Sequence, residues 1–177
     1  FDLFPQTGIH WTQEAALQVF DEILNSLESK GFTLKHVTSD GREMQSTPRR
    51  NSKNNDDDVW QLMNIFTKME TTYSYPIEKE LIPQKYDLPA VFAQGGSFSY
   101  NIIEAFSNHD VARDVNFLFY NQSLYDYEGN MRPVNDLYDY TIQQKVLESD
   151  IILLEVNAQA VNTESDRKSG SAGMPRP

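Results

Sequence analysis

The spacing of apolar residues near the start of the chain predicts a helix. From Thr12 to about Lys30 the apolar positions recur at three- and four-residue steps, which is typical of a helix with one buried stripe. Thr12 is suited to cap the first turn, and Gly31 is suited to end the helix. The stripe consists of Ala15, Ala16, Val19, Phe20, Ile23, Leu24 and Leu27.

A second helix is expected after a polar segment. Residues 38–57 are polar and include Pro48, so we interpret them as an exposed loop. The acidic run from Asp56 to Asp58 stands at the start of the helix, where the helix dipole favours negative charge. The apolar residues that share one face of this helix are Val59, Leu62, Met63, Phe66 and Met69.

The second half of the chain alternates between short apolar runs and helical stretches. The runs suited to buried strands are residues 88–93, 115–120 and 151–156, and the helical stretches between them are residues 100–106 and 137–147. An order of β-α-β-α-β predicts right-handed crossovers and a parallel sheet with helices on both faces. The predicted fold class is therefore α/β, with three layers in the order α/β/α.

Residues 1–162 are expected to form one domain. A chain of 177 residues, 39% of them hydrophobic, is long enough for one packed core and leaves little room for a second. Residues 163–177 are rich in Ser, Gly and Pro, and we expect a disordered tail or a linker there. The chain opens at Phe1 without an initiator Met or a signal segment, so we expect a fragment whose N-terminal part is missing.

The charge balance argues against several function classes. The formal net charge is −11, whereas nucleic-acid binding requires clustered Lys and Arg. The chain has no cysteine and three scattered histidines, so neither a disulfide nor a dense set of metal ligands is expected. We therefore expect no nucleic-acid partner and no metal. The serine mechanism considered below needs no organic cofactor either.

Ser97 stands in the turn Gly95-Gly96-Ser97-Phe98-Ser99, between a predicted strand and the helix that follows it. Ligands of open parallel sheets bind beyond the carboxyl ends of the strands, which is where this turn is expected. The glycines permit a tight turn, and the backbone N–H groups from Gly96 to Phe98 are suited to stabilise an oxyanion. The pattern differs from G-x-S-x-G because Ser99 replaces the second glycine. Ser97 is a candidate nucleophile, and the alternative is that it only caps the helix.

His10 and Trp11 lie immediately before the first predicted helix, so the imidazole can be held at a helix N-terminus beside an indole. A histidine within reach of Ser97 can take its proton and act as a general base. The alternative is a surface or capping histidine, which is how we interpret His36 and His109.

Several patches together resemble a known family. They are the His-Trp pair before a helix, the acidic run before Leu-Met-Asn-Ile, the Gly-Gly-Ser-Phe-Ser turn, and Asp-Ile-Ile-Leu-Leu-Glu-Val-Asn at residues 150–157. In their order and spacing, over roughly residues 4–160, they resemble the SGNH hydrolase-like domains of the alginate O-acetyltransferase group. Relatives in this group acetylate alginate, peptidoglycan and secondary cell-wall polysaccharides.

The resemblance implies that Ser97 is the nucleophile and His10 the base. In this group the histidine motif commonly reads Asp-x-His-Trp and the serine motif Gly-Asp-Ser-Phe or Gly-Thr-Ser-Tyr, so Gly8 and Gly96 are departures. Loss of the carboxylate that orients the histidine lowers turnover about 10⁴-fold in serine proteases. Either another carboxylate replaces it, or the site is a weak dyad, or the site is inactive.

Asp57 and Asp58, within the acidic run, are the first candidates to orient His10, and the alternative is that the run only caps a helix. Asn157 follows Glu155 at the end of the last predicted strand, as in the Glu-Val-Asn-Glu ending of the family. It is suited either to donate a hydrogen bond into the site or to fix a loop. Trp11 is a further candidate contact for the substrate.

These residues predict a serine-dependent O-acyltransferase that moves an acetyl group through an acyl-serine intermediate onto a polysaccharide hydroxyl. The resemblance implies an extracytoplasmic setting in the cell envelope or periplasm, with any membrane anchor in the missing N-terminal part. It also implies a polysaccharide acceptor and a membrane-bound O-acyltransferase that delivers the acyl donor. The alternatives are an acetyl-ester hydrolase acting on carbohydrate and a non-catalytic carbohydrate-binding relative.

Overall fold

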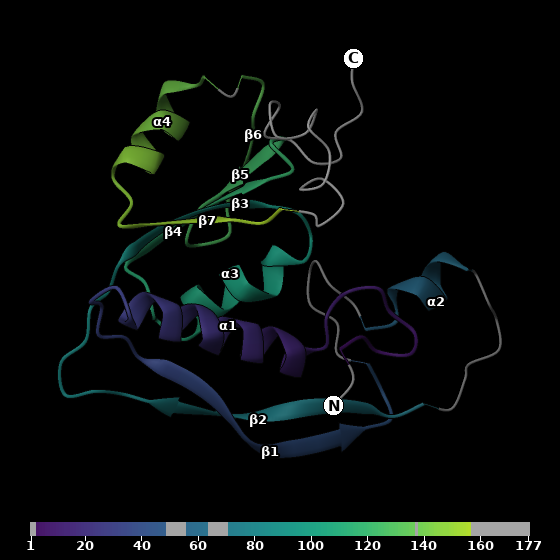
Figure 1. The fold of residues 1–177 in the computed structure, drawn as a ribbon. Coiled ribbons are helices and arrows are strands. Elements are labelled where there is room, and N and C mark those ends of the chain that lie inside the picture. The colour runs from purple at the N-terminus through teal and green to yellow at the C-terminus, as the bar shows by residue number, and fades with distance from the viewer. Residues whose placement is uncertain (1–2, 49–55, 64–70, 137, 157–177) are drawn as a thin grey trace. The chain divides into compact units, whose positions relative to one another are not determined.

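The computed structural model describes residues 3–48, 56–63, 71–136 and 138–156 (Figure 1). The chain forms two compact units that alternate along the sequence. The first unit consists of residues 1–89 and 97–113, and the second consists of residues 90–96 and 114–177. The expectation of one domain over residues 1–162 stays a prediction, and the expected tail at 163–177 lies outside the described residues.

The first helix of the first unit forms as the apolar spacing predicts. Helix α1 spans Gln13–Glu28, and the Thr12 hydroxyl accepts a hydrogen bond from the Ala15 N–H, so Thr12 is the N-cap. Helix α3 spans Ser99–Asn108. Helix α1 packs against α3 and against a two-stranded hairpin (Figure 1). Phe20 of α1 and Phe106 of α3 are fully buried and meet edge to face, with ring centroids 4.8 Å apart.

The hairpin corrects the prediction of an exposed loop over residues 38–57. Strand β1 spans His36–Gln45 and pairs antiparallel with strand β2, Tyr73–Leu81. The prediction was wrong because most β1 side chains face solvent and the strand therefore lacks an alternating apolar pattern. Only Val37 of β1 is fully buried. The pairing register shifts between Ser39 and Arg42, at the sequence Asp40-Gly41.

The second predicted helix is short and its expected apolar face is not buried. Helix α2 spans Asp58–Leu62 and has no buried residue. Leu62 is 78% exposed and Met63 is 62% exposed. Phe66 and Met69 lie outside the described residues. The prediction that Leu62 and Met63 belong to a buried helix face is therefore wrong.

The second unit is built on a five-stranded sheet with the order β6-β5-β4-β3-β7. Strands β3 (Ala90–Gly95), β4 (Asp114–Phe119) and β7 (Ile151–Leu154) correspond to the three predicted strands. Strand β3 pairs in parallel with both of the others, as the alternating pattern predicts. Helix α4, Tyr140–Leu147, lies beside this sheet (Figure 1). Its Ile142 packs against Phe92, Leu118 and Leu124.

Two strands of this sheet were not predicted. Strands β5 (Ser123–Tyr125) and β6 (Met131–Pro133) are three residues long and pair antiparallel, β4 with β5 and β5 with β6. Three residues are too few to display a period of two, so their pattern gave no signal. The sheet is therefore mixed rather than parallel. The structure confirms the α/β class but not the purely parallel sheet.

No helix within the described ranges has the length and apolar character that crossing a bilayer requires.

The packing of Phe20 on Phe106 predicts a large loss of stability on truncation. Replacing Phe20 by Ala leaves a cavity at a fully buried position, and we expect the free energy of unfolding to fall by about 3–5 kcal/mol. Urea denaturation followed by circular dichroism measures this change. Tyr138, which is 83% exposed, is the control, and Tyr138→Ala is expected to change stability by less than about 0.5 kcal/mol. Equal losses in the two variants would contradict the assignment of Phe20 to the core.

Candidate functional site

His10 binds a carboxylate from a distant segment of the first unit. Its Nδ1 lies 2.6 Å from Oδ2 of Asp58, and the two side chains are 15% and 17% exposed. The other carboxylate oxygen, Oδ1, accepts a hydrogen bond from the Ile9 N–H at 3.0 Å. A carboxylate at Nδ1 favours the neutral tautomer with the proton on Nδ1, which leaves the lone pair on Nε2. Of the two neutral tautomers, this is the one in which Nε2 can accept a proton.

The segments that carry His10 and Asp58 are tied together by Thr7. Its backbone carbonyl accepts hydrogen bonds from the Val59 and Trp60 N–H groups at 3.1 and 3.3 Å. Its hydroxyl donates to the Asp56 carbonyl at 2.8 Å and lies 2.9 Å from the Tyr73 hydroxyl. Thr7 is 5% exposed, so these bonds are protected from water. The two segments are thereby fixed against strand β2.

Gly8 is required by this close approach. A Cβ added at Gly8 would lie 2.8 Å from the Asp56 carbonyl oxygen and 2.8 Å from Cγ of Pro5. Carbon and oxygen do not approach this closely without a shift of the backbone. An aspartate at position 8, which the resembled family usually has, would require the Asp56 backbone or Pro5 to shift, and in this structure the carboxylate on His10 comes from position 58.

Phe98 brings the serine turn to the histidine motif. Its ring centroid lies 5.7 Å from that of His10, 5.6 Å from that of Trp11 and 6.3 Å from that of Phe4. Because Phe98 follows Ser97 directly, the two motifs meet within the first unit. Distances of this size are typical of packed aromatic pairs.

The N-cap of helix α3 is Phe98, so Ser97 precedes the cap. The Ser97 carbonyl accepts a hydrogen bond from the Tyr100 N–H at 3.3 Å. The alternative in which Ser97 only caps this helix stays a prediction.

Gly96, expected to help to form an oxyanion hole, already has a partner in the second unit. Its N–H donates to Oε2 of Glu155 at 2.9 Å, and the Glu155 N–H donates to the Gln94 carbonyl at 2.9 Å. A Cβ added at Gly96 would lie 2.9 Å from the Tyr120 ring, so only glycine fits without a shift. The Gly96 N–H can reach a ligand only after its bond to Glu155 breaks.

The remaining candidates differ in their outcome. Asp57 is the N-cap residue of α2, and its carboxylate accepts from the Gln61 amide at 2.6 Å rather than from His10. Asn157 lies outside the described residues.

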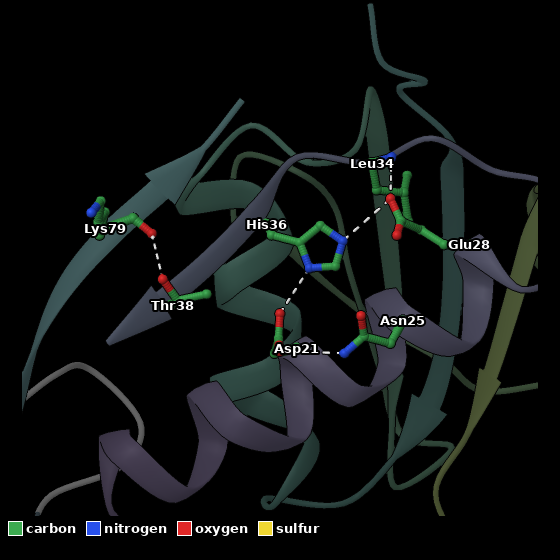
Figure 2. Close-up of polar contacts among 7 residues, drawn as sticks. All are labelled: Asp21, Asn25, Glu28, Leu34, His36, Thr38 and Lys79. Carbon is green, nitrogen blue, oxygen red and sulfur yellow. Dashed lines mark hydrogen bonds and ion pairs between the residues drawn. The ribbon is translucent and has the colours of Figure 1, made fainter. Parts of the chain in front are cut away.

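His36 lies between two carboxylates of helix α1, as Figure 2 shows. Its Nδ1 is 2.8 Å from Asp21 and its Nε2 is 3.3 Å from Glu28. Both ring nitrogens can donate only when the imidazole is protonated. Burial lowers the pKa of His36, but the hydrogen bonds and charges of Asp21 and Glu28 outweigh it, so the net pKa is raised.

His109, the C-cap residue of helix α3, lies in the same way between two carboxylates of strand β2. Its Nε2 lies 3.3 Å from Glu78 and its Nδ1 lies 3.1 Å from Glu80, while Lys35 approaches Glu80 at 3.5 Å. The hydrogen bond to Glu78 is the largest cause that raises the pKa of His109; burial opposes it and Glu80 adds to it. His36 and His109 thus join their elements through ion pairs, a role that the apolar pattern did not indicate.

The part of the chain that the structure describes contains no group of three or more His, Asp or Glu side chains arranged to hold a metal ion. At His36 and at His109, the two carboxylates bind opposite nitrogens of the imidazole ring, so the carboxylates do not form a chelating site for a metal ion.

No protein-family model, curated protein or solved structure matches this chain.

The raised pKa values of His36 and His109 predict that stability falls as the pH rises. Each folded-state pKa lies above the ordinary value of 6.5, so the folded protein binds more protons than the unfolded chain at and above this pH. The stabilisation is complete below about pH 6.5 and is lost as the pH rises through the folded-state values. Urea denaturation between about pH 6 and about pH 8 measures the slope. Replacing both histidines by Gln should flatten it, and an unchanged slope would refute the assignment.

The contact distances at Gly8 predict that Gly8→Ala disturbs the site. The added methyl group must push the Asp56 carbonyl or Pro5 away, and overpacking of this kind costs about 1–3 kcal/mol. We expect a corresponding fall in the free energy of unfolding and a changed NMR signal for the proton on His10 Nδ1. Ser26→Ala, at an exposed site on α1, is the control and should change neither quantity. Native stability together with an unchanged His10 signal in Gly8→Ala would show that the segment 56–58 does not pack as described.

Proposed function

We propose that the protein is a serine-dependent O-acyltransferase of the SGNH type, which moves an acetyl group through an acyl-serine onto a polysaccharide hydroxyl. The observation that carries this proposal is the His10–Asp58 pair, with Nδ1 and Oδ2 2.6 Å apart, packed beside Phe98. A histidine with a carboxylate at Nδ1, close in the fold to a serine turn, is the arrangement that serine hydrolases and transferases use. The three-layer α/β/α arrangement of the SGNH fold is part of the proposal.

In the acylation step, Ser97 Oγ attacks the carbonyl carbon of the acyl donor and His10 Nε2 takes the hydroxyl proton. Asp58 holds the imidazole in its tautomer and stabilises the imidazolium that forms. The tetrahedral intermediate collapses, the donor's leaving group departs with the proton from His10, and the acetyl group remains on Ser97. The neutral base is restored for the second step.

In the transfer step, His10 takes the proton of an acceptor hydroxyl, and the acceptor oxygen attacks the acyl-serine carbonyl. Collapse of this intermediate forms the acceptor ester and returns the proton from His10 to Ser97 Oγ. The N–H groups at the start of α3, at residues 98 and 99, are suited to stabilise the oxyanion in both steps. The Gly96 N–H contributes only where Glu155 releases it.

The setting belongs to the same proposal. The chain acts outside the cytoplasm in the cell envelope, on a polysaccharide acceptor, and a membrane-bound O-acyltransferase supplies the acyl donor. No metal or organic cofactor takes part, because Ser97, His10 and Asp58 suffice for both proton transfers. These statements rest on the family resemblance of the sequence, and the His10–Asp58 geometry supports its catalytic part.

Two alternatives use the same fold. An acetyl-ester hydrolase would use the same three residues with water in place of the acceptor hydroxyl. A non-catalytic carbohydrate-binding relative was suggested by the absence of an aspartate at position 8. The carboxylate of Asp58 on His10 supports the catalytic proposal over that second alternative, because it supplies a group of the kind that Gly8 lacks.

Covalent labelling of Ser97 tests the proposal. In the folded protein an activated acetyl ester or a serine-directed sulfonyl fluoride should modify Ser97, and mass spectrometry should place the added mass on the Gly95-Gly96-Ser97 peptide. Ser97→Ala should abolish the label. Asp58→Asn should lower the labelling rate at least about tenfold, which is about 1.4 kcal/mol in activation free energy.

Asp57→Asn is the matched control, because Asp57 precedes Asp58 in the chain and its carboxylate binds Gln61 rather than His10. It should label at nearly the native rate. Label on Ser99 would move the nucleophile by two residues. If a folded protein takes no label at either serine, the acyltransferase proposal fails. Product analysis with and without an acceptor then separates transfer from hydrolysis.

A further inference from the structure

Glu155, which directly follows strand β7, binds the end of strand β3 and the glycine that precedes Ser97. Its N–H donates to the Gln94 carbonyl, and its carboxylate oxygen Oε2 accepts from the Gly96 N–H, both at 2.9 Å. Glu155, Gln94 and Gly96 all belong to the second unit. Because Ser97 follows Gly96 directly in the chain, the carboxylate holds the backbone one residue before the candidate nucleophile.

Tyr120, which directly follows strand β4, holds the same turn. Its N–H donates to the Gly95 carbonyl at 2.9 Å, and a Cβ added at Gly96 would lie 2.9 Å from its ring. Strand β3 lies between β4 and β7 in the sheet. The Gly95 carbonyl and the Gly96 N–H belong to one peptide group, so the residues after the two neighbouring strands bind both polar groups of this peptide.

The two glycines make this double hold important for the serine. Glycine has the greatest backbone freedom of all residues, so Gly95 and Gly96 by themselves would leave the following residue in many orientations. Fixing the peptide between them removes part of that freedom before a substrate binds. The rate of a reaction depends strongly on such placement, since a displacement of about 1 Å can cost about 100-fold in rate.

The other end of the β3–β7 pair has an equivalent carboxylate and no candidate nucleophile. The Asp150 N–H donates to the Ala90 carbonyl at 2.9 Å, and the Ala90 N–H donates to Asp150 Oδ2 at 2.8 Å. Ala90 is the first residue of β3, whereas Gly95 is the last. A carboxylate therefore closes the strand pair at each end, and only the one from Glu155 holds the serine turn.

We propose that Glu155 is a positioning residue of the reaction, whose carboxylate accepts the Gly96 N–H and thereby holds the turn that presents Ser97. The inference rests on the proposed acyltransferase function and adds a residue that acts through the nucleophile. It assigns the Gly96 N–H to the turn and not to the oxyanion hole. The role requires a hydrogen-bond acceptor at position 155, and it does not require a negative charge.

The rate at which phenylmethylsulfonyl fluoride labels Ser97 measures how well the nucleophile is placed. This probe is uncharged, so removal of the Glu155 charge does not change its attraction to the site. Glu155→Ala removes an exposed side chain and should lower the labelling rate of the folded protein at least about tenfold. Glu155→Gln keeps an oxygen acceptor and should label within about threefold of the native rate. A loss in Glu155→Gln as large as in Glu155→Ala would overturn the inference, because the charge would then be the required property.

Asp150→Ala is the matched control, because it removes the equivalent carboxylate at the other end of the same strand pair. It should label at nearly the native rate while it remains folded, whatever stability it loses. Equal losses of labelling in Asp150→Ala and Glu155→Ala would show that Glu155 only closes the strand pair. Faster labelling in Glu155→Ala would also overturn the inference, because the carboxylate would then block an oxyanion donor.

Amide hydrogen exchange gives a readout that does not depend on the chemistry. Exchange of the Gly96 N–H should be at least about tenfold faster in Glu155→Ala than in the native protein, and unchanged in Asp150→Ala. Native exchange at Gly96 in Glu155→Ala would overturn the inference whatever the label shows. If the native protein takes no label, the proposed function fails, and the exchange rate still decides whether Glu155 holds the turn.

Discussion

The hydrogen bond between His10 and Asp58 depends on a close backbone approach that only glycine permits at position 8. Thr7 alone makes three hydrogen bonds to residues 56–60, and a Cβ added at Gly8 would lie 2.8 Å from the Asp56 carbonyl oxygen. A separation of the two segments would act directly on the contact between Asp58 Oδ2 and His10 Nδ1, which are 2.6 Å apart. The candidate chemistry of the first unit therefore depends on the packing at this glycine.

The hairpin β1–β2 supports this arrangement from outside the site. The Tyr73 and Tyr75 side chains of β2 are buried, and their hydroxyls bind Thr7 and the Asp56 carboxylate. Helix α1 is joined to the hairpin by the Glu14–Arg42 ion pair and by the contact of His36 with Asp21 (Figure 2). A strand pair that is largely exposed thus has a structural role, because its buried tyrosines fix the loop from which the acidic run approaches His10.

The elements that could be predicted from the sequence are those whose burial has a clear period. Helix α1 and strands β3, β4 and β7 were predicted because Phe20, Val91 and Val115 belong to regular apolar patterns. The hairpin was missed because β1 buries little, and β5 and β6 were missed because each is three residues long. Apolar periodicity indicates which residues are buried. It gives no signal for strands β1, β5 and β6, because these strands are held by backbone hydrogen bonds to their neighbours.

At the candidate site, the sequence indicated His10 and Ser97 by their motifs and Asp58 only as one member of an acidic run. The carboxylate that binds the histidine lies 48 residues away in the chain. A pattern within one segment cannot indicate a contact over this separation. The same limit applies to Tyr73 and Thr7, whose hydroxyl contact joins residues 66 positions apart. No alternation or spacing within one segment specifies such a pairing.

The shift of the carboxylate from position 8 to position 58 has a chemical consequence for the imidazole. A carboxylate two residues before the histidine would share its backbone and move with it, whereas Asp58 belongs to the start of helix α2. The Ile9 N–H on Oδ1 and the imidazole on Oδ2 then fix the carboxylate from two directions. A histidine oriented in this way depends on the docking of two segments, so any change that loosens Thr7 or Tyr73 should weaken the base before it unfolds the unit. Catalytic arrangements are defined by geometry and not by order in the chain, and here the required carboxylate is supplied through tertiary contact.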